Sequence, residues 1–178
     1  MKHNDILFLA TAVLGTFGFA NSASIDGTIT ISSGTILGNP RHANGALSFK
    51  GIPYAAPLIG DLRWKSPQPP VPFANMLNAT QCGASCYVST TAKVPYFTPP
   101  SENCLFLNVW TAAPLSTKER PVMVFIPGAG FQFGSAAHPT HDGSNLANEG
   151  VVVVTLNYRL GVSASLDSRN LMQKTKLW

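Results

Sequence analysis

Charged side chains are scarce in this sequence of 178 residues, where Asp, Glu, Lys and Arg make up 11% and hydrophobic residues 45%. Disordered chains combine high charge with few apolar residues, so the composition excludes them and favours a loop-rich globular domain with 15 glycines and 14 prolines. The formal net charge is +4, but the lysines and arginines form no stripe interleaved with aromatic residues. Nucleic acid is therefore not an expected partner.

Several sequence signatures of catalytic sites are also missing. No Gly-Lys-Ser/Thr element follows the glycine-rich stretch 127–134, which excludes a P-loop, and the glycine spacing of the dinucleotide fingerprint is absent. No serine has glycine both two residues before it and two residues after it, so the chain contains no G-x-S-x-G nucleophile elbow. His138 and His141 have no cluster of carboxylates or cysteines beside them, so we interpret them as solvated loop histidines. We expect neither a metal nor a cofactor.

The chain has one long apolar run, and it lies at the N-terminus. Lys2 precedes the run 6–20, and the small residues 21–24 follow it. A positive start, a short apolar centre and a small-residue exit predict a secretory signal peptide over residues 1–23. The protein is then secreted to the extracellular space and keeps no stable membrane anchor. A membrane anchor or a buried helix is the alternative, although the run is short for a bilayer.

Two further features of the sequence are informative if the protein is secreted. The triplet 78–80, Asn-Ala-Thr, is a glycosylation sequon, which predicts a glycan on Asn78. Three cysteines, Cys82, Cys86 and Cys104, allow one disulfide in an oxidising compartment and leave one thiol over. The sequence alone does not choose the pair.

The pattern along the chain indicates an α/β sheet. Residues 25–36 alternate apolar residues with Ser, Thr and Gly, which predicts a short antiparallel hairpin, and 49–64 reads as a rigid irregular loop. A short helix is expected near 145–149 and ends at Gly150. Strands are expected at 105–111, 122–126 and 151–158, the last two being continuous apolar runs typical of strands buried on both faces. Strand, loop, short helix and strand follow one another as in α/β proteins.

A glycine-rich loop, Gly128-Ala129-Gly130-Phe131, comes directly after the expected strand 122–126. Small residues let backbone N–H groups converge on one point, where they can hold a phosphate or the oxyanion of a tetrahedral acyl intermediate. A simple tight turn explains the same glycines. Both interpretations stay open from these residues alone.

Four motifs in order resemble those of the type-B carboxylesterase family, which also includes cholinesterases and fungal lipases. They are GIPYAAP at 51–57 with Gly60, Arg63 and Trp64 beyond it, ENCLFLNVW at 102–110, PVMVFIPGAGF at 121–131 and VTLNYRLG at 154–161. The resemblance implies an incomplete α/β-hydrolase fold over residues 24–162. This N-terminal part would hold the first hairpin and the first strands of the central mixed sheet.

The resemblance also implies roles for residues of the glycine-rich loop. The backbone amides of Ala129 and Gly130, beside Gly128, match oxyanion donors of the family, whose members hydrolyse small-molecule esters without a cofactor. Arg63 matches a structural ion-pair residue rather than a catalytic one. The triad of serine, acid and histidine is missing, so the chain is expected to be inactive as written.

The family's disulfide pattern matches Cys86 with Cys104, which leaves Cys82 as the spare thiol. The loop between the paired cysteines lacks the tryptophan that cholinesterases use to hold a quaternary ammonium. A choline ester is therefore not the expected substrate.

After Val162 the family continues Phe-Gly-Phe, whereas this chain reads Ser-Ala-Ser. One inserted base after the Val162 codon lets a permitted back-translation read as a family-like continuation. We therefore interpret residues 163–178 as a frameshifted tail outside the family pattern; a natural exon boundary or a retained intron is the alternative. With the later strands and most covering helices missing, the strands at 122–126 and 151–156 are expected to expose apolar faces and to make the chain poorly soluble.

Two other functions remain open from the sequence. A non-catalytic secreted binding module of the same fold is one, although such relatives usually keep the whole domain. An unrelated secreted β-rich domain is the other, and the four ordered motifs argue against it. The sequence does not indicate an oligomeric state.

Overall fold

The computed structural model describes residues 27–40, 44–88, 97–112, 119–128, 130–161 and 163. The expected signal peptide and nearly all of the expected tail lie outside these residues. Within them the strands are β1 (Thr28–Ile31), β2 (Gly34–Leu37), β3 (Ala46–Pro53), β4 (Leu77–Asn78), β5 (Ser85–Cys86), β6 (Pro100–Ser101), β7 (Phe106–Ala112), β8 (Val122–Phe125) and β9 (Val152–Leu156). The helical segments are the 3-10 turns η1 (Gly60–Leu62) and η2 (Pro139–His141) and the α-helix α2 (Ser144–Asn148).

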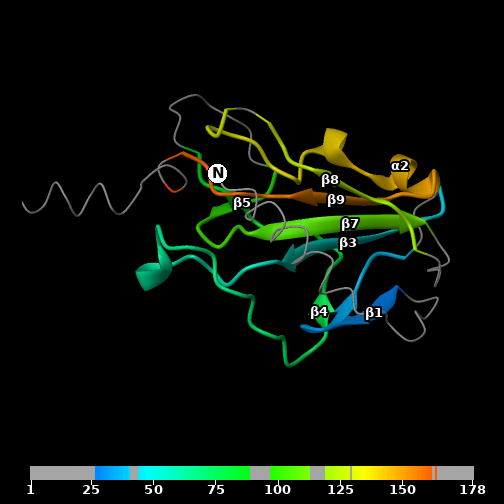
Figure 1. Ribbon diagram of the computed structural model, residues 1–178, viewed down its shortest axis with the longest axis horizontal. Helices are drawn as coiled ribbons and strands as arrows, with labels where there is room; N and C mark the ends of the chain where they lie inside the picture. The colour runs from blue at the N-terminus through cyan, green and yellow to red at the C-terminus, as the bar shows by residue number, and fades with distance from the viewer. Residues whose placement is uncertain are drawn as a thin grey trace, which may run out of the picture.

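A four-stranded mixed sheet in the order β3-β7-β9-β8 forms the centre of the molecule (Figure 1). Strand β7 runs antiparallel to both β3 and β9, whereas β8 runs parallel to β9. Because α2 lies between these two parallel neighbours in the chain, β8, α2 and β9 form a βαβ unit. The structure therefore has the α/β class and the mixed sheet that the sequence predicts.

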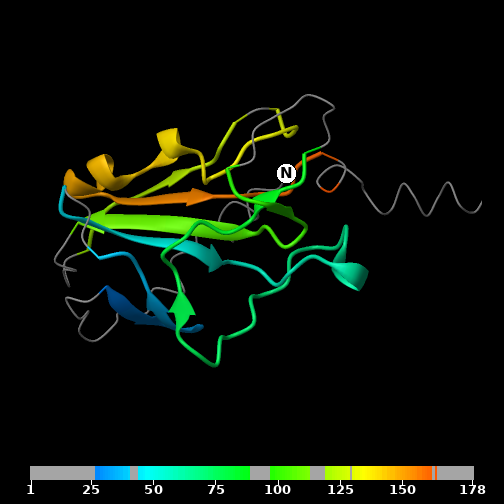
Figure 2. The same cartoon turned by 180° about the vertical axis from the view of Figure 1, so that it is seen from behind.

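The N-terminal hairpin is also present. Strands β1 and β2 pair antiparallel with Ile29 opposite Ile36, and β4 joins β2 in parallel. This small sheet packs on one face of the central sheet, while α2 lies on the other, as Figures 1 and 2 show from opposite sides. The interface between the two sheets is filled by Ile36, Phe49 and Val154. The interface between α2 and the central sheet is filled by Trp110, Ala147 and Val153.

The prediction of an irregular loop over residues 49–64 is wrong for its first five residues, because Phe49 to Pro53 belong to β3. The register of β3 against β7 shifts between Phe49 and Ile52, which marks a bulge. Gly51 sits in that bulge with φ of +71°, and its N–H donates at 2.9 Å to the side-chain Oδ1 of Asn108, a residue of the neighbouring strand β7. Glycine and proline are typical of loops, so their presence at the end of this bulged strand explains why the sequence pattern predicted a loop.

The two continuous apolar runs differ in burial. All four residues of β8 are at least 42% exposed, unlike a strand buried on both faces but in line with the expected apolar exposure. β9 is buried from Val153 to Leu156, so the exposure expected for it is wrong. The reason is what covers each strand: Val154 and Leu156 of β9 belong to the core cluster beneath the N-terminal sheet and Val153 to the cluster beneath α2, whereas no residue of β8 belongs to either cluster.

Helix α2 occupies the place that the sequence predicts, and Gly150 follows its end with φ of +87°. With only five residues it packs through Ala147, which is fully buried. None of the helices in the described part of the chain has the length and apolar character needed to cross a bilayer.

Candidate active site

The glycine-rich loop follows the C-terminal end of β8 and contacts the residues that come after β9. Gly130 and Phe131 both have a left-handed backbone, with φ of +60° and +61°. The loop is fastened by two hydrogen bonds of 2.7 Å, one from the N–H of Gly161 to the carbonyl of Phe131 and one from the hydroxyl of Tyr158 to the carbonyl of Pro127. The ring of Phe131 also meets that of Tyr158 edge to face.

The loop is open at its glycines. Gly128 and Gly130 are exposed, and a Cβ built on either residue meets no heavy atom within 4 Å. A ligand atom can therefore approach the backbone there, as an oxyanion donor requires. Ala129 lies outside the described residues, and the role of Ala129 and Gly130 as oxyanion donors, with Gly128 beside them, stays a prediction.

Asn157, at the end of β9, anchors the segment that follows the loop. It is 6% exposed; its Oδ1 accepts the N–H of Ala136 at 2.8 Å, and its Nδ2 donates to the carbonyl of Ala84 at 2.9 Å. The Tyr54 hydroxyl donates to the Asn157 carbonyl at 2.6 Å. Burial raises the pKa of Tyr54, and the positive charge of Arg159 only partly opposes this, so Tyr54 stays a neutral donor.

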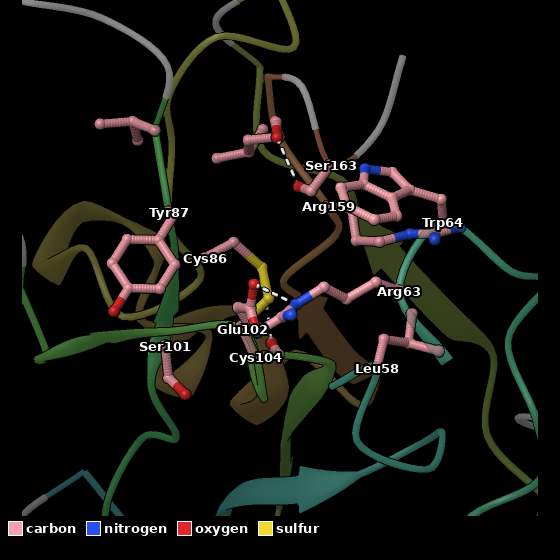
Figure 3. A pocket seen from close by; sticks show the side chains of 12 residues that line it. Leu58, Arg63, Trp64, Cys86, Tyr87, Ser101, Glu102, Cys104, Arg159 and Ser163 are labelled. Atoms are coloured by element: carbon pink, nitrogen blue, oxygen red, sulfur yellow. Dashed lines mark hydrogen bonds and ion pairs between the residues drawn. A yellow bond between two sulfur atoms is a disulfide. The ribbon is translucent and has the colours of Figure 1, made fainter. Parts of the chain in front are cut away.

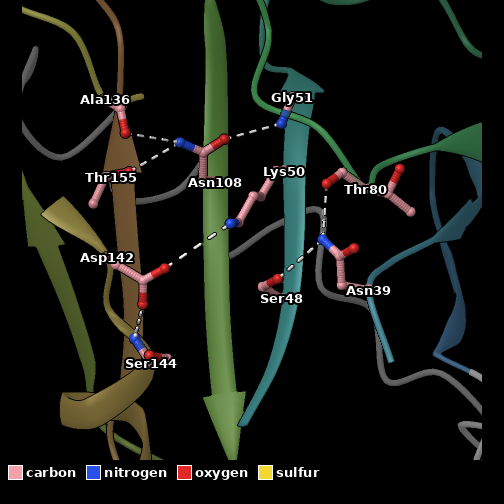
Figure 4. A network of polar contacts seen from close by, with 10 residues as sticks. All are labelled: Asn39, Ser48, Lys50, Gly51, Thr80, Asn108, Ala136, Asp142, Ser144 and Thr155. Carbon is pink, nitrogen blue, oxygen red and sulfur yellow. Dashed lines mark hydrogen bonds and ion pairs between the residues drawn. The ribbon is translucent and has the colours of Figure 1, made fainter. Parts of the chain in front are cut away.

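Asn108 of β7 forms a second buried anchor, shown in Figure 4. Its Nδ2 donates to the carbonyl of Ala136 at 3.3 Å and to Oγ1 of Thr155 at 3.1 Å, while its Oδ1 accepts from Gly51. The bulge of β3, the strand β9 and the segment after the glycine-rich loop are thus tied to one amide. Sequence reasoning assigned no role to either asparagine; the available signal was an asparagine within each of two predicted apolar strands.

The two histidines lie at the short turn η2, between β8 and α2, and are partly exposed loop residues, as the interpretation from sequence has them. Both are half-buried, with ring centres 5.1 Å apart. The Nδ1 atom of His141 lies 2.9 Å from the carbonyl of Ser135, and that of His138 accepts the N–H of Thr140 at 3.1 Å. Across the described residues, no three His, Cys, Asp or Glu side chains gather as a metal site.

The side-chain hydroxyls of Ser85, Thr98 and Ser135 form a cluster close to the histidines. The Oγ atoms of Ser85 and Ser135 are 3.0 Å apart, and Oγ1 of Thr98 lies 2.8 Å from that of Ser85. Neither serine has a histidine within hydrogen-bond distance of its hydroxyl among the contacts of the described residues. The cluster therefore links loops and does not form an activated nucleophile.

Arg63 forms an ion pair, as the resemblance implies, and the structure shows that its partner is Glu102, to whose carboxylate Nε and Nη2 of Arg63 both donate (Figure 3). Hydrogen bonding from Arg63 lowers the pKa of Glu102. The pair borders a cavity of about 260 Å³ that Trp64, Tyr87 and the disulfide also line. Among the described residues of the glycine-rich stretch, 127–128 and 130–134, none lines this cavity.

The disulfide joins Cys86 and Cys104, as the resemblance implies, and both cysteines are buried. Cys82 is the free thiol. Burial raises its pKa, which Lys50 opposes and Asp142 reinforces, so the thiol is less reactive than an exposed one.

We expect Cys104→Ala to lower the free energy of unfolding by about 3 kcal/mol, because the disulfide closes a loop of 18 residues. Denaturant unfolding of the oxidised chain measures this. Cys82→Ala is the matched control and should change stability by less than about 1 kcal/mol, since Cys82 is unpaired. Equal losses in both variants would show that the disulfide is not the source.

Asn78, the expected glycan acceptor, is exposed on β4. Its Oδ1 accepts from the N–H of Thr80 at 3.1 Å and from its hydroxyl at 2.7 Å. The sequon is therefore accessible at the surface, while its modification stays a prediction.

A mixed sheet with a βαβ unit, from whose parallel strand an open glycine-rich loop emerges, is the architecture of an α/β-hydrolase in its N-terminal part. The sequence model of the carboxylesterase family matches residues 26–168, and the chain belongs to that family.

Relatives agree with this assignment. The chain is 43% identical over 137 residues to para-nitrobenzyl esterase of Bacillus subtilis (strain 168), which covers 75% of this chain and 27% of the relative. It is 42% identical to fumonisin B1 esterase of Sphingopyxis macrogoltabida, over 65% of this chain and 22% of the relative. It is also 42% identical to cholinesterase of Mus musculus, over 76% and 24%. The chain thus spans about a quarter of the length of these relatives.

Proposed function

We propose that this chain is the N-terminal portion of a secreted carboxylic-ester hydrolase, and that its glycine-rich loop supplies the oxyanion hole for a small-molecule ester. The observation that carries the proposal is the open backbone at Gly128 and Gly130, at the end of a parallel strand. Ala129 and Gly130 are the donors, with Gly128 beside them. Each such N–H stabilises the negative charge that develops on the carbonyl oxygen in the transition state.

The chain alone is proposed to be inactive, because its 178 residues contain no G-x-S-x-G elbow. An oxyanion hole without a nucleophile and a base cannot turn over an ester by the serine-hydrolase mechanism. The purified chain should release no p-nitrophenol from p-nitrophenyl acetate above the uncatalysed rate. Turnover that survives repurification would overturn this part of the proposal.

A chimera tests the positive part of the proposal. Residues 27–161 replace the corresponding segment of the Bacillus subtilis esterase, which supplies the other three-quarters of the domain. We expect the chimera to hydrolyse p-nitrophenyl acetate, because the two segments are 43% identical where they align. A chimera that melts cooperatively yet shows no turnover would contradict the role assigned to the loop.

Secretion and glycosylation belong to the same proposal. Expressed in a eukaryotic secretory host, the full chain should lose residues 1–23 and carry a glycan on the exposed Asn78. Endoglycosidase treatment should lower its apparent mass, and Asn78→Gln should abolish that shift. A medium fraction with an intact N-terminus and no shift would argue against both.

The tail at 163–178 is proposed to arise from a frameshift near the Val162 codon. Sequencing the genomic locus and its transcript across that codon tests this. A neighbouring frame that restores Phe-Gly-Phe and leads to a G-x-S-x-G elbow would support the proposal. A neighbouring frame closed by stop codons would reject it.

A further inference from the structure

The glycine-rich loop and the segment that follows β9 leave the same edge of the central sheet. Strands β8 and β9 are parallel neighbours with Phe125 opposite Thr155, so their C-terminal ends lie side by side (Figure 1). Pro127 follows shortly after the first strand and Tyr158 shortly after the second. The pairing thus brings the Tyr158 side chain to the start of the loop, where its hydroxyl donates to the carbonyl of Pro127.

Gly134 closes the loop at the same point. Its φ is +131°, and a Cβ built on it would lie 2.9 Å from the carbonyl oxygen of Gly128 and 3.7 Å from the Cβ of Pro127. The first of these distances is too short for a carbon and an oxygen that are not bonded, so a side chain at 134 would push the Gly128 carbonyl away. Glycine lets the chain return this close to the start of the loop.

These contacts act on the peptide groups next to the proposed donors. The carbonyl of Gly128 belongs to the same peptide group as the N–H of Ala129, and the carbonyl of Pro127 belongs to the peptide group before it. Because a peptide group is planar, a carbonyl that is held in place also fixes the direction of the N–H in its plane. On the far side of the loop, the carbonyl of Phe131 is held by the N–H of Gly161.

We propose that Gly134 and Tyr158 are positioning residues of the oxyanion hole. Gly134 leaves room for the carbonyl of Gly128, and Tyr158 holds the carbonyl before it, so that the donor N–H groups converge on one oxygen atom. Both residues act through the loop and not on the substrate. Each contact joins two described residues of this chain, so it does not depend on what the rest of a longer domain covers. The inference rests on the proposed ester-hydrolase function and adds the residues that orient its donors.

Kinetics of the active chimera test the role in catalysis. Gly134→Ala should lower kcat roughly 100-fold, because a displacement of about 1 Å at a catalytic group has an effect of this size. Tyr158→Phe keeps the ring against Phe131 and loses only the hydroxyl, so kcat should fall about tenfold, less than for the loss of a whole donor. KM should change little in both variants, since the bonds of an oxyanion hole strengthen only in the transition state.

Gly150→Ala and Tyr87→Phe are the matched controls. Gly150 also has a positive φ, of +87°, but a Cβ there meets no heavy atom within 4 Å. Tyr87 is 52% exposed and lies outside the glycine-rich loop. Both controls should leave kcat near that of the parent chimera. Equal losses of kcat in variants and controls would overturn the proposal, because backbone strain or a lost hydroxyl would then explain them.

A trifluoromethyl ketone inhibitor separates a displaced donor from a general loss of structure. Its carbonyl carbon forms a tetrahedral adduct with the nucleophile of the chimera, and the resulting oxyanion occupies the hole. As for any transition-state analogue, its inhibition constant should rise by the same factor as kcat/KM falls. An inhibition constant that stays unchanged while kcat falls would reject the positioning role.

Hydrogen exchange in the full chain tests the contacts without any turnover. The N–H of Gly161 is held by the carbonyl of Phe131, so its exchange reports whether the loop keeps its place. Gly134→Ala and Tyr158→Phe should speed this exchange at least about tenfold, whereas both controls should leave it unchanged. Unchanged exchange in the two variants would overturn the inference. A parent chimera without turnover would count against the proposed function alone, and faster exchange would still support these residues as the ones that hold the loop.

Discussion

Replacing Gly130 by valine in the active chimera is expected to lower kcat about 100-fold or more while KM changes little, the size of effect that loss of one oxyanion donor produces. Gly130 has φ of +60°, a conformation that a β-branched residue adopts only with strain. The loop must then rearrange and turn its N–H groups away from the carbonyl oxygen. Because these bonds strengthen only in the transition state, the loss falls on kcat.

Gly60 offers a closely matched control for this substitution. Its φ is +54°, and a Cβ there also meets no heavy atom within 4 Å, yet it lies in η1, away from the glycine-rich loop. Gly60→Val should therefore cost similar backbone strain and leave kcat near that of the parent chimera. Initial rates with p-nitrophenyl acetate, with melting curves for both variants, make the comparison. Equal losses of kcat would show that strain, not a lost donor, explains the effect.

Replacing Asn108 by alanine is expected to lower the free energy of unfolding by about 4 kcal/mol, since it strands several buried polar groups at once. The side chain is 2% exposed and serves the N–H of Gly51, the carbonyl of Ala136 and the hydroxyl of Thr155. Alanine leaves all three without this partner in a space that the removed amide vacates. The loss should also loosen the β3 bulge that depends on the Gly51 contact.

Urea unfolding followed by tryptophan fluorescence measures this loss, because Trp110 is buried two residues from Asn108 on the same strand. Asn145→Ala is the control: Asn145 is exposed on α2, its Oδ1 accepts one bond from Asn44, and its loss should cost less than about 0.5 kcal/mol. A loss below about 1 kcal/mol for Asn108→Ala would mean that the network does not hold these elements together.

Local patterns predicted the elements that obey a simple period. The hairpin at β1 and β2, the strand β7 and the helix α2 appear where alternation, apolar runs and a terminal glycine place them. Strand β3 was missed because its bulge at Gly51 interrupts the alternation, and the contact that makes the bulge favourable comes from Asn108, 57 residues away. A local pattern carries no information about such a partner.

Some features of the candidate site could likewise be predicted from the sequence, and others could not. Ordered motifs and the resemblance they carry indicated the glycine-rich loop, the disulfide and an ion-pair role for Arg63, whose partner Glu102 is known from the structure. The asparagines that hold the loop's surroundings were not found, because their partners come from distant segments: Asn157 reaches Ala84, which is 73 residues away. The ring contacts of the histidines were not predicted for a related reason, since Phe97 and Phe125, which pack against His138 and His141, are distant in sequence.

By itself the sequence determined the family, the α/β class and the position of the open loop, because all three follow from short runs of neighbouring residues. Burial was decided by the tertiary structure. The apolar runs of β8 and β9 are alike in composition, yet β9 packs beneath both the N-terminal sheet and α2, whereas the side chains of β8 belong to neither of these core clusters and are exposed. Burial depends on which segments come together in space, and that is fixed by the whole chain.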